Sequence, residues 1–550
     1  MPKEREDIET KSSGSPEVYQ QTKFMTWFEK AFPWLLVGGA ALGLVLMIFL
    51  PVIFFQEKTA EQLLAQSNLR LALLYTTGGA IAAFGLLETY RKNTNDRAKA
   101  NADINAALKN QEHQAEVLKE QIRQFDENAF KERKAERRER YTKAVEQLGD
   151  EKAPIRMGGV YTLVGLVDEW LEEKSLSDDE RFKEGQVIIN NLCAYIRSPF
   201  TLASHYDELS QDSPTPEGIY KDKKEEFYID KAILDSEADV RLSIIKEIHD
   251  RIQGPDKNTP GAWSDFEYDF SGSTFFYPID LTNSYYAKPI NFSDSIYQSR
   301  ADFSGSTYKS WAYFGGSTYQ GGADFSGSTY KDVADFGVST YQGRTDFSRS
   351  TYQWANFSDS TYQGWAYFSD STYKSWAYFT GSTYQWANFS DSTYKSWAYF
   401  SDSTYENETN FSGSIFYQET YFGEDGYSNS SSCFTNRAPQ FYDKKKRKNT
   451  LFGSPNNDFT VDIDKGYPID LDSKGIPLNC KFLTSEQKEY LEGILQEIEK
   501  INNKLFEVKD LAKKTELLKK LRSLNEELHK WREKVTTVQV EDVAAEDTKS

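Results

Sequence analysis

The sequence predicts a multi-domain chain of 550 residues, in which membrane helices and an α-helical section precede a β-solenoid and a C-terminal helical hairpin. Three observations predict this order: two apolar runs near the start, an aromatic period over 264–435, and two apolar seams at helical spacing near the end. The formal net charge of -19 argues against nucleic-acid binding, which needs a basic face to neutralise phosphates.

Two uncharged runs predict transmembrane helices at 32–55 and 71–88, although the second is at the short end of the spanning range. A signal peptide is the alternative for the first run, and a buried helical hairpin is the alternative for the second. Basic residues flank the outer ends of the runs and are scarce in the short external loop at 56–70. The positive-inside bias therefore predicts a multi-pass protein of the inner, cytoplasmic membrane, with both termini and the 1–31 tail in the cytoplasm.

Apolar residues alternating at spacings of four and three predict a coiled coil over 89–135. The candidate seam consists of Ile104, Leu108, Ala115, Leu118, Ile122 and Phe125. A parallel coiled coil would make the protein a homo-oligomer, and a single amphipathic helix is the alternative. Further apolar repeats at 157–171 and 240–252 predict short paired helices, so that 136–260 forms a HEAT-like α-helical module.

From Phe270 to Tyr427, large and mostly aromatic residues recur at alternating spacings of five and six, and a small residue precedes most of them by two. A helix does not suit this pattern, because a step of five residues rotates by about 500° and separates successive aromatic residues by about 140°. A flat strand fails as well, because an odd step points successive side chains to opposite faces. A chain that turns a corner every five or six residues keeps them all inside. The period therefore predicts a four-walled β-helix over 264–435.

The repeat also resembles a known family. Ala-Asp-Phe-Ser-Gly-Ser-Thr-Tyr at 301–308, and again at 323–330, is similar to the pentapeptide repeat, which implies a right-handed quadrilateral β-helix. Segments at 139–148, 155–161 and 192–197 resemble the helical module of membrane-anchored bacterial pentapeptide-repeat proteins. Two departures matter here. The extra residue in alternate walls implies bulged corners, and the inward tyrosines need partners for their hydroxyls.

After the repeat, the sequence at 436–480 reads as a linker, and its basic run at 444–448 is either solvated or in contact with anionic lipid. Thr484 and Gln487 form a capping box that opens a helix. Two apolar seams that are out of phase predict a helical hairpin at 481–535, with one stuttered helix as the alternative. The acidic tail at 536–550 is expected to be disordered.

The sequence holds no catalytic motif, no cofactor-binding loop and no metal-ligand spacing, so we expect a non-enzymatic protein without a cofactor. Aspartates recur one residue before inward phenylalanines, and we expect them to be solvated rather than to bind calcium. They are Asp302, Asp324, Asp335 and Asp346.

The leading hypothesis is a membrane-tethered scaffold that presents its solenoid to an unknown cytoplasmic protein. Six tryptophans beside the solenoid corners form the candidate interaction surface, although each could merely shield its corner. They are Trp311, Trp354, Trp365, Trp376, Trp386 and Trp397. The alternatives are a DNA-mimicking modulator of a topoisomerase-like enzyme and a membrane sensor that relays a signal.

Overall fold

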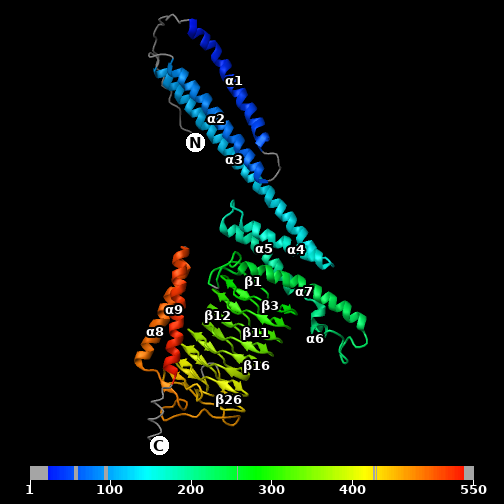
Figure 1. The fold of residues 1–550 in the computed structure, drawn as a ribbon, viewed down its shortest axis with the longest axis vertical. Coiled ribbons are helices and arrows are strands. Elements are labelled where there is room, and N and C mark those ends of the chain that lie inside the picture. Colours follow the sequence, from blue (N-terminus) through cyan, green and yellow to red (C-terminus); the bar gives the residue numbers. More distant parts are fainter. Residues whose placement is uncertain are drawn as a thin grey trace, which may run out of the picture. The chain divides into compact units, whose positions relative to one another are not determined.

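The computed structural model describes most of the chain (Figure 1). The described residues are 23–54, 60–91, 97–256, 258–424, 428, 430–508 and 510–537. Residues 1–22 of the expected tail, residues 56–59 of the expected external loop and the acidic tail from 538 onward lie outside them. The chain divides into two compact units, Met1–Glu132 and Arg133–Ser550, and each is described by itself.

The first unit contains α1 (Lys23–Phe54) and α2 (Ala60–Arg91), which pack against each other. The approach is close at Gly43, where a Cβ would clash with the Thr77 side chain. Among the described residues, one helical stretch, Leu36–Phe54, is long and apolar enough to cross a membrane. The second expected span, at 71–88, is not identified in this way, and its side chains from 84 onward lie outside the described residues.

The helix α3 (Arg97–Leu148) carries the candidate coiled-coil seam and continues past its expected end at 135. Leu108 and Phe125 are 46% and 57% exposed, and Ala115 is exposed as well. Leu118 and Ile122 are half-buried, and the side chain of Ile104 lies outside the described residues. The seam thus leaves apolar side chains exposed in the single chain, and the coiled coil stays a prediction.

If this seam pairs copies of the chain, a fragment of residues 89–260 should sediment as an oligomer at tens of micromolar. Burial of a seam of this length against a second helix is the driving force. Replacing Leu118 and Ile122 with aspartate places charges in the core of the coil, and this double variant should sediment as a monomer. A monomer from the unaltered fragment would contradict the coiled coil.

In the second unit, a helical module packs against the first coil of the solenoid. Its elements are α4 (Ala153–Leu171), α5 (Asp178–Arg197), the 3₁₀ helix η1 (Thr201–His205), α6 (Tyr206–Leu209) and α7 (Lys224–Ile252). Trp263 and Phe266 are fully buried below these helices, and Trp263 Nε1 donates to Asp168 on α4. Arg197 on α5 pairs with Asp269. The module therefore closes one end of the solenoid.

The solenoid is a right-handed β-helix of about seven turns with four walls (Figure 1). Its walls fall into two parallel sheets, walls 4 and 1 in one and walls 2 and 3 in the other. Wall 1 holds β1 (Tyr268–Asp269), β5 (Ile290–Asn291), β9 (Ala312–Tyr313), the ends of β12 (Thr329–Asp335) and β15 (Thr351–Asn356), β18 (Ala377–Tyr378), β21 (Ala398–Tyr399) and β25 (Thr420–Tyr421). Wall 2 holds β2 (Thr274–Phe275), β6 (Ile296–Tyr297), β10 (Thr318–Tyr319), β13 (Thr340–Tyr341), the starts of β16 (Thr361–Tyr367) and β19 (Thr383–Asn388), β22 (Thr404–Tyr405) and β26 (Cys433–Phe434).

The other two walls complete each coil. Wall 3 holds β3 (Ile279–Asp280), β7 (Ala301–Asp302), β11 (Ala323–Asp324), β14 (Thr345–Asp346), the ends of β16 and β19, and β23 (Thr409–Asn410). Wall 4 holds β4 (Tyr285–Tyr286), β8 (Thr307–Tyr308), the starts of β12 and β15, β17 (Thr372–Tyr373), β20 (Thr393–Tyr394), β24 (Ile415–Phe416), β29 (Leu451–Phe452) and β30 (Lys481–Phe482).

Each wall contributes one inward ladder of side chains. Phenylalanines stack along walls 1 and 3, as in Phe303 over Phe325 at 5.1 Å between ring centroids. Tyrosines stack along walls 2 and 4, as in Tyr308 over Tyr330 at 4.7 Å. Phenylalanines of the opposite walls 1 and 3 meet edge to face, as in Phe314 against Phe325, and so do rings of neighbouring walls, as in Tyr308 against Phe314. The inward position of the periodic residues, predicted from their spacing, is confirmed from Phe270 to Phe422, whereas Tyr427 lies outside the described residues.

Small residues two positions before the aromatic ones complete the interior. On walls 1 and 3 they are mostly alanines, and on walls 2 and 4 they are buried serines. Ser306 shows the pattern, because its Oγ accepts from the backbone N–H of Ser284 at 3.1 Å and donates to Leu281 O at 3.1 Å. These serines bind each coil to the previous one through their side chains.

Within the described part of the solenoid, most inward tyrosine hydroxyls have no hydrogen-bond partner. Those without one are Tyr286, Tyr297, Tyr308, Tyr319, Tyr330, Tyr362, Tyr373, Tyr384, Tyr394 and Tyr405. The hydroxyl of Tyr352, by contrast, donates to Phe347 O at 3.2 Å. Tyr352 and Tyr373 are successive rungs of one ladder, with ring centroids 5.1 Å apart. The two tyrosines occupy the same position in successive coils and differ in this hydrogen bond.

Replacing Tyr373 with phenylalanine should raise the free energy of unfolding by about 1 kcal/mol, because it removes an unpaired buried hydroxyl. Tyr352→Phe removes a hydroxyl that has a partner, so it should leave the stability unchanged or lower it. Denaturant unfolding of the two variants measures the difference. Equal effects would show that both hydroxyls have the same environment.

The corners of the solenoid contain inserted residues and residues whose backbone has the left-handed conformation. Tyr330 pairs with Tyr352 but Val333 pairs with Trp354, so the longer strand carries a bulge at the corner, as expected. The residue three before an inward tyrosine has a positive φ, which explains why glycine, aspartate and asparagine recur there. Val338 (φ 58°) adopts this conformation although it is β-branched.

The segment at 436–480 is not a linker but continues the solenoid. Phe434, Phe441, Phe452 and Phe459 stack on the four inward rings of the previous coil. Longer loops separate them, so the spacing of five and six is lost. The basic run forms the tip of a small antiparallel hairpin between β27 (Tyr442–Asp443) and β28 (Lys448–Asn449).

The chain ends in the expected helical hairpin, formed by α8 (Ser485–Glu507) and α9 (Leu511–Thr536). The capping box of Thr484 and Gln487 opens α8, and Asp510 caps α9. Leu491, Ile494 and Ile498 pack with the leucines of α9 into one core, which Ile415 and Leu451 of wall 4 join. The hairpin therefore covers part of wall 4.

Candidate functional site

One corner of the solenoid, between walls 4 and 1, carries a column of tryptophans. We call Trp311, Trp354, Trp376 and Trp397 the tryptophan edge. The backbone N–H groups of Ala355 and Ala377 donate to Trp376 O and Trp397 O, so Trp354, Trp376 and Trp397 follow one another from coil to coil. Trp311 is 47% exposed and Trp397 is 37% exposed, while Trp354 and Trp376 are half-buried.

Stacking between coils orders this edge. The rings of Trp376 and Trp397 lie 5.6 Å apart at 14°, and Trp397 Nε1 donates to Glu419 at 2.6 Å. Trp354 packs on Tyr378 at 5.5 Å. Each indole thus shields its corner and still exposes part of its face. Corner shielding and partner binding are both compatible with this geometry.

The diagonally opposite corner carries the other two candidates. Trp365 pairs in register with Trp386, and their rings stack at 5.6 Å. Trp365 is 41% exposed and Trp386 is half-buried. The structure therefore separates the six tryptophans into one longer column and one pair on two different edges.

Sequence reasoning missed an outward tyrosine column beside the tryptophan edge. Tyr378, Tyr399 and Tyr421 project from wall 1 and stack on one another at 5.0 and 5.2 Å. Each is the outward residue of its strand, directly before an inward phenylalanine. The repeated Ala-Tyr-Phe at 377–379 and 398–400 was the available signal. Tyr378 and Tyr421 are half-buried and Tyr399 is buried, so stacking covers most of this column.

The recurring aspartates lie outside the core, as expected, but they are not simply solvated. Asp302 accepts from the backbone N–H of Ser304 and pairs with Arg300, and Asp346 pairs with Arg344. These contacts hold the corner turns. Over the described residues, no group of three His, Cys, Asp or Glu side chains gathers as metal ligands would.

Partly buried ion pairs fix the C-terminal hairpin on wall 4. Arg532 of α9 is almost fully buried and donates to Asp370 at 2.7 Å. Lys448 pairs with Asp391 at 2.6 Å and approaches Glu533 at 3.7 Å. Both aspartates occupy the left-handed corner position of their coils. The hairpin is therefore positioned by residues that the coil geometry itself requires.

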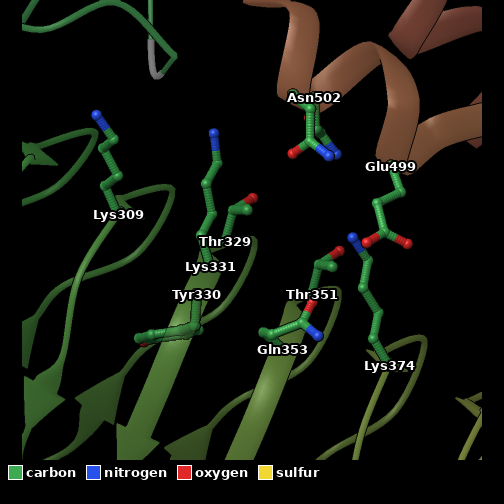
Figure 2. Close-up of a pocket in the computed structure, with 10 residues that line it drawn as sticks. Lys309, Thr329, Tyr330, Lys331, Thr351, Gln353, Lys374, Glu499 and Asn502 are labelled. Atoms are coloured by element: carbon green, nitrogen blue, oxygen red, sulfur yellow. The ribbon is translucent and has the colours of Figure 1, made fainter. Parts of the chain in front are cut away.

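Between wall 4 and α8 lies a cleft of about 320 Å³. Residues that directly follow the inward tyrosines of wall 4 line one side of it, namely Lys309, Lys331, Gln353 and Lys374. We call these residues, with Lys395 of the next coil, the lysine row. Glu499, Asn502 and Asn503 of α8 line the other side. Figure 2 shows the lysine side chains extending from the strands toward the side of the cleft on which Asn502 and Glu499 lie.

The cleft concentrates like charges. Burial and, to a smaller extent, the charges of Lys374, Lys309 and Lys514 of α9 lower the pKa of Lys331 to about 8. Burial also lowers the pKa of Lys374, whereas the carboxylate of Glu499 opposes this shift. The row was visible in the sequence as repeated Thr-Tyr-Lys, but the helix that covers it could not be placed from the sequence.

Comparison of the chain with protein-family models, curated proteins and solved structures found no match.

Proposed function

We propose that the protein is a non-enzymatic, membrane-tethered scaffold whose solenoid binds a protein partner on the cytoplasmic side through the tryptophan edge. The observation that carries this proposal is the column of partly exposed indoles at one corner. Tryptophan and tyrosine are enriched among residues that dominate protein–protein binding, and exposed apolar patches mark contact surfaces.

The rest of the solenoid supports this role through rigidity. Four continuous ladders, buried serines between coils and a helical module at one end leave little freedom to the corner that carries the indoles. A preordered surface loses little conformational entropy on binding. Successive indoles follow the coils, which are about 4.8 Å apart. A partner with an extended or helical apolar stripe fits such a column.

Replacing Trp354, Trp376 and Trp397 with serine should weaken partner capture from native membranes by tenfold or more while the β circular dichroism stays unchanged. Loss of two or three binding hot spots of about 2 kcal/mol each is the reason. The matched control replaces Trp365 and Trp386, which stack in the same way on the opposite edge. Equal loss in both variants, or unfolding of the triple variant, would favour corner shielding instead.

We also propose that α1 and α2 form a two-span membrane hairpin with both termini in the cytoplasm. The close approach of Gly43 to Thr77 supports this, because small residues let transmembrane helices pack closely. The basic residues after α2 favour a cytoplasmic position for the chain beyond that helix.

A membrane-impermeant maleimide tests this topology on chains that carry Thr59→Cys or Asn95→Cys. In intact cells the reagent should label the substituted residue 59, whereas residue 95 should react after the membrane is permeabilised. The native cysteines, which are all buried, serve as the background control. Labelling of both positions from the same side would show that α2 does not cross.

A further inference from the structure

The small hairpin between β27 and β28 ends in four consecutive basic residues. We call Lys444, Lys445, Lys446 and Arg447 the basic tip. All four side chains are exposed, and in the part of the chain that the structure describes no ion pair involves them. The next residue of the run, Lys448, is half-buried and pairs with Asp391 at 2.6 Å. The fold therefore uses one charge of the basic run and leaves four of them in solvent.

The backbone around the basic tip is well defined. The chain enters the hairpin at Phe441, whose ring is buried in the last coil. The carboxylate of Asp443 accepts from the backbone N–H groups of Lys445 and Lys446 at 2.8 and 3.1 Å. Arg447 closes the turn with a φ of 52°, a conformation that glycine or asparagine adopts at a lower cost. The geometry of the turn therefore does not account for four adjacent cations, which repel one another.

We propose that the basic tip binds the surface of an anionic lipid bilayer. Lysine side chains are strongly hydrated point charges on flexible stems, and they suit the diffuse charge of many headgroups better than one oriented ligand. Each basic residue near such a surface strengthens binding about fivefold, so that four together strengthen it several hundredfold. In a chain that is already tethered to a membrane, lipid is present at a high effective concentration. The lipid contact itself depends neither on the tether nor on the tryptophan edge.

The residues after α9 are the competitor for the basic tip within the chain. A bridge between Lys448 and Thr537 places the end of the described chain beside the hairpin. The sequence beyond it holds four carboxylates, which are Glu541, Asp542, Glu546 and Asp547. The experiment therefore includes a variant in which the corresponding amides replace these four residues.

Co-sedimentation of the full chain with vesicles tests the proposal, with the chain held in nanodiscs of neutral phosphatidylcholine. The nanodiscs should sediment with vesicles in which one third of the lipid is phosphatidylglycerol, but not with vesicles of pure phosphatidylcholine. Nanodiscs without the protein should stay in solution. Salt at about 1 M, where the screening length falls to about 3 Å, should release the chain. Absence of binding to the anionic vesicles, in a chain whose circular dichroism is native, would overturn the proposal.

Variants locate the contact. Replacing the three lysines of the basic tip with glutamine and Arg447 with asparagine should weaken vesicle binding about a hundredfold or more. The matched control has the same net charge, because it replaces four exposed lysines elsewhere with glutamine, and it should change the affinity less than about threefold. These lysines are Lys174, Lys183, Lys221 and Lys288. Equal loss in the control would show that the overall charge and not the basic tip drives binding.

Other occupants of the basic tip give different results. Arg447→Lys keeps the charge and should bind the vesicles as the unaltered chain does, whereas loss of binding would indicate a ligand of fixed geometry. The amide variant of the acidic residues should bind at least as tightly, and binding by this variant alone would assign the basic tip to the acidic tail. A short DNA duplex that displaces the vesicles at a lower concentration of charge would assign it to nucleic acid.

Two results separate this inference from the proposed function. The variant that lacks Trp354, Trp376 and Trp397 should still bind anionic vesicles, because it keeps the basic tip. Failure of the chain to enter nanodiscs would contradict the membrane tether and not the lipid contact, and the free chain would then be sedimented with the same vesicles. Loss of vesicle binding in the tryptophan variant would show that the indoles, and not the basic tip, contact the lipid.

Discussion

The vertical register between coils is the constraint on which the other features of the solenoid depend. Every coil places its aromatic rings over those of the previous coil, at distances such as 4.4 Å for Tyr297 and Tyr319. Each aromatic pair contributes about 0.5–1.5 kcal/mol beyond the burial of its area. A slip of one residue would turn every inward side chain outward, so the register is strongly specified. The helical module then closes one end, and the hairpin covers part of one wall.

The same register explains why the hydroxyls of inward serines form hydrogen bonds, whereas those of most inward tyrosines do not. A serine is short enough for its Oγ to reach the backbone of the neighbouring coil, and Ser317 does so toward Ser295 N and Phe292 O. The phenol of a stacked tyrosine extends toward the centre, where other rings surround it. Burial raises the pKa of Tyr319 well above its usual value, so the hydroxyl stays neutral. An unpaired hydroxyl costs about 1–3 kcal/mol, which stacking on both neighbours offsets.

The spacing of residues along the sequence predicted the solenoid well, because each wall and corner is formed by residues that are five or six positions apart. The inward positions, the small residues before them, the bulged corners and the outward tryptophans are all consequences of steps of five and six. The coil formed by Phe434, Phe441, Phe452 and Phe459 was missed, because long loops break this spacing while the stacking persists. The docking of α9 was missed for another reason. Arg532 and Asp370 are 162 residues apart, and neither lies in a pattern that points to the other.

Packing of the core does not determine which residues occupy the outward positions of the solenoid. The interior requires an aromatic ring, a small residue and a corner residue that accepts positive φ, and it places no condition on the residue after the inward tyrosine. Lysine at 309 and tryptophan at 311 are separated by one serine, so the lysine row and the tryptophan edge run side by side along one corner. The helix α8 faces the lysine row and leaves Trp311 and Trp397 of the tryptophan edge exposed. The contacts that hold α8 against wall 4 therefore also determine which groups border the surface that we propose for the partner.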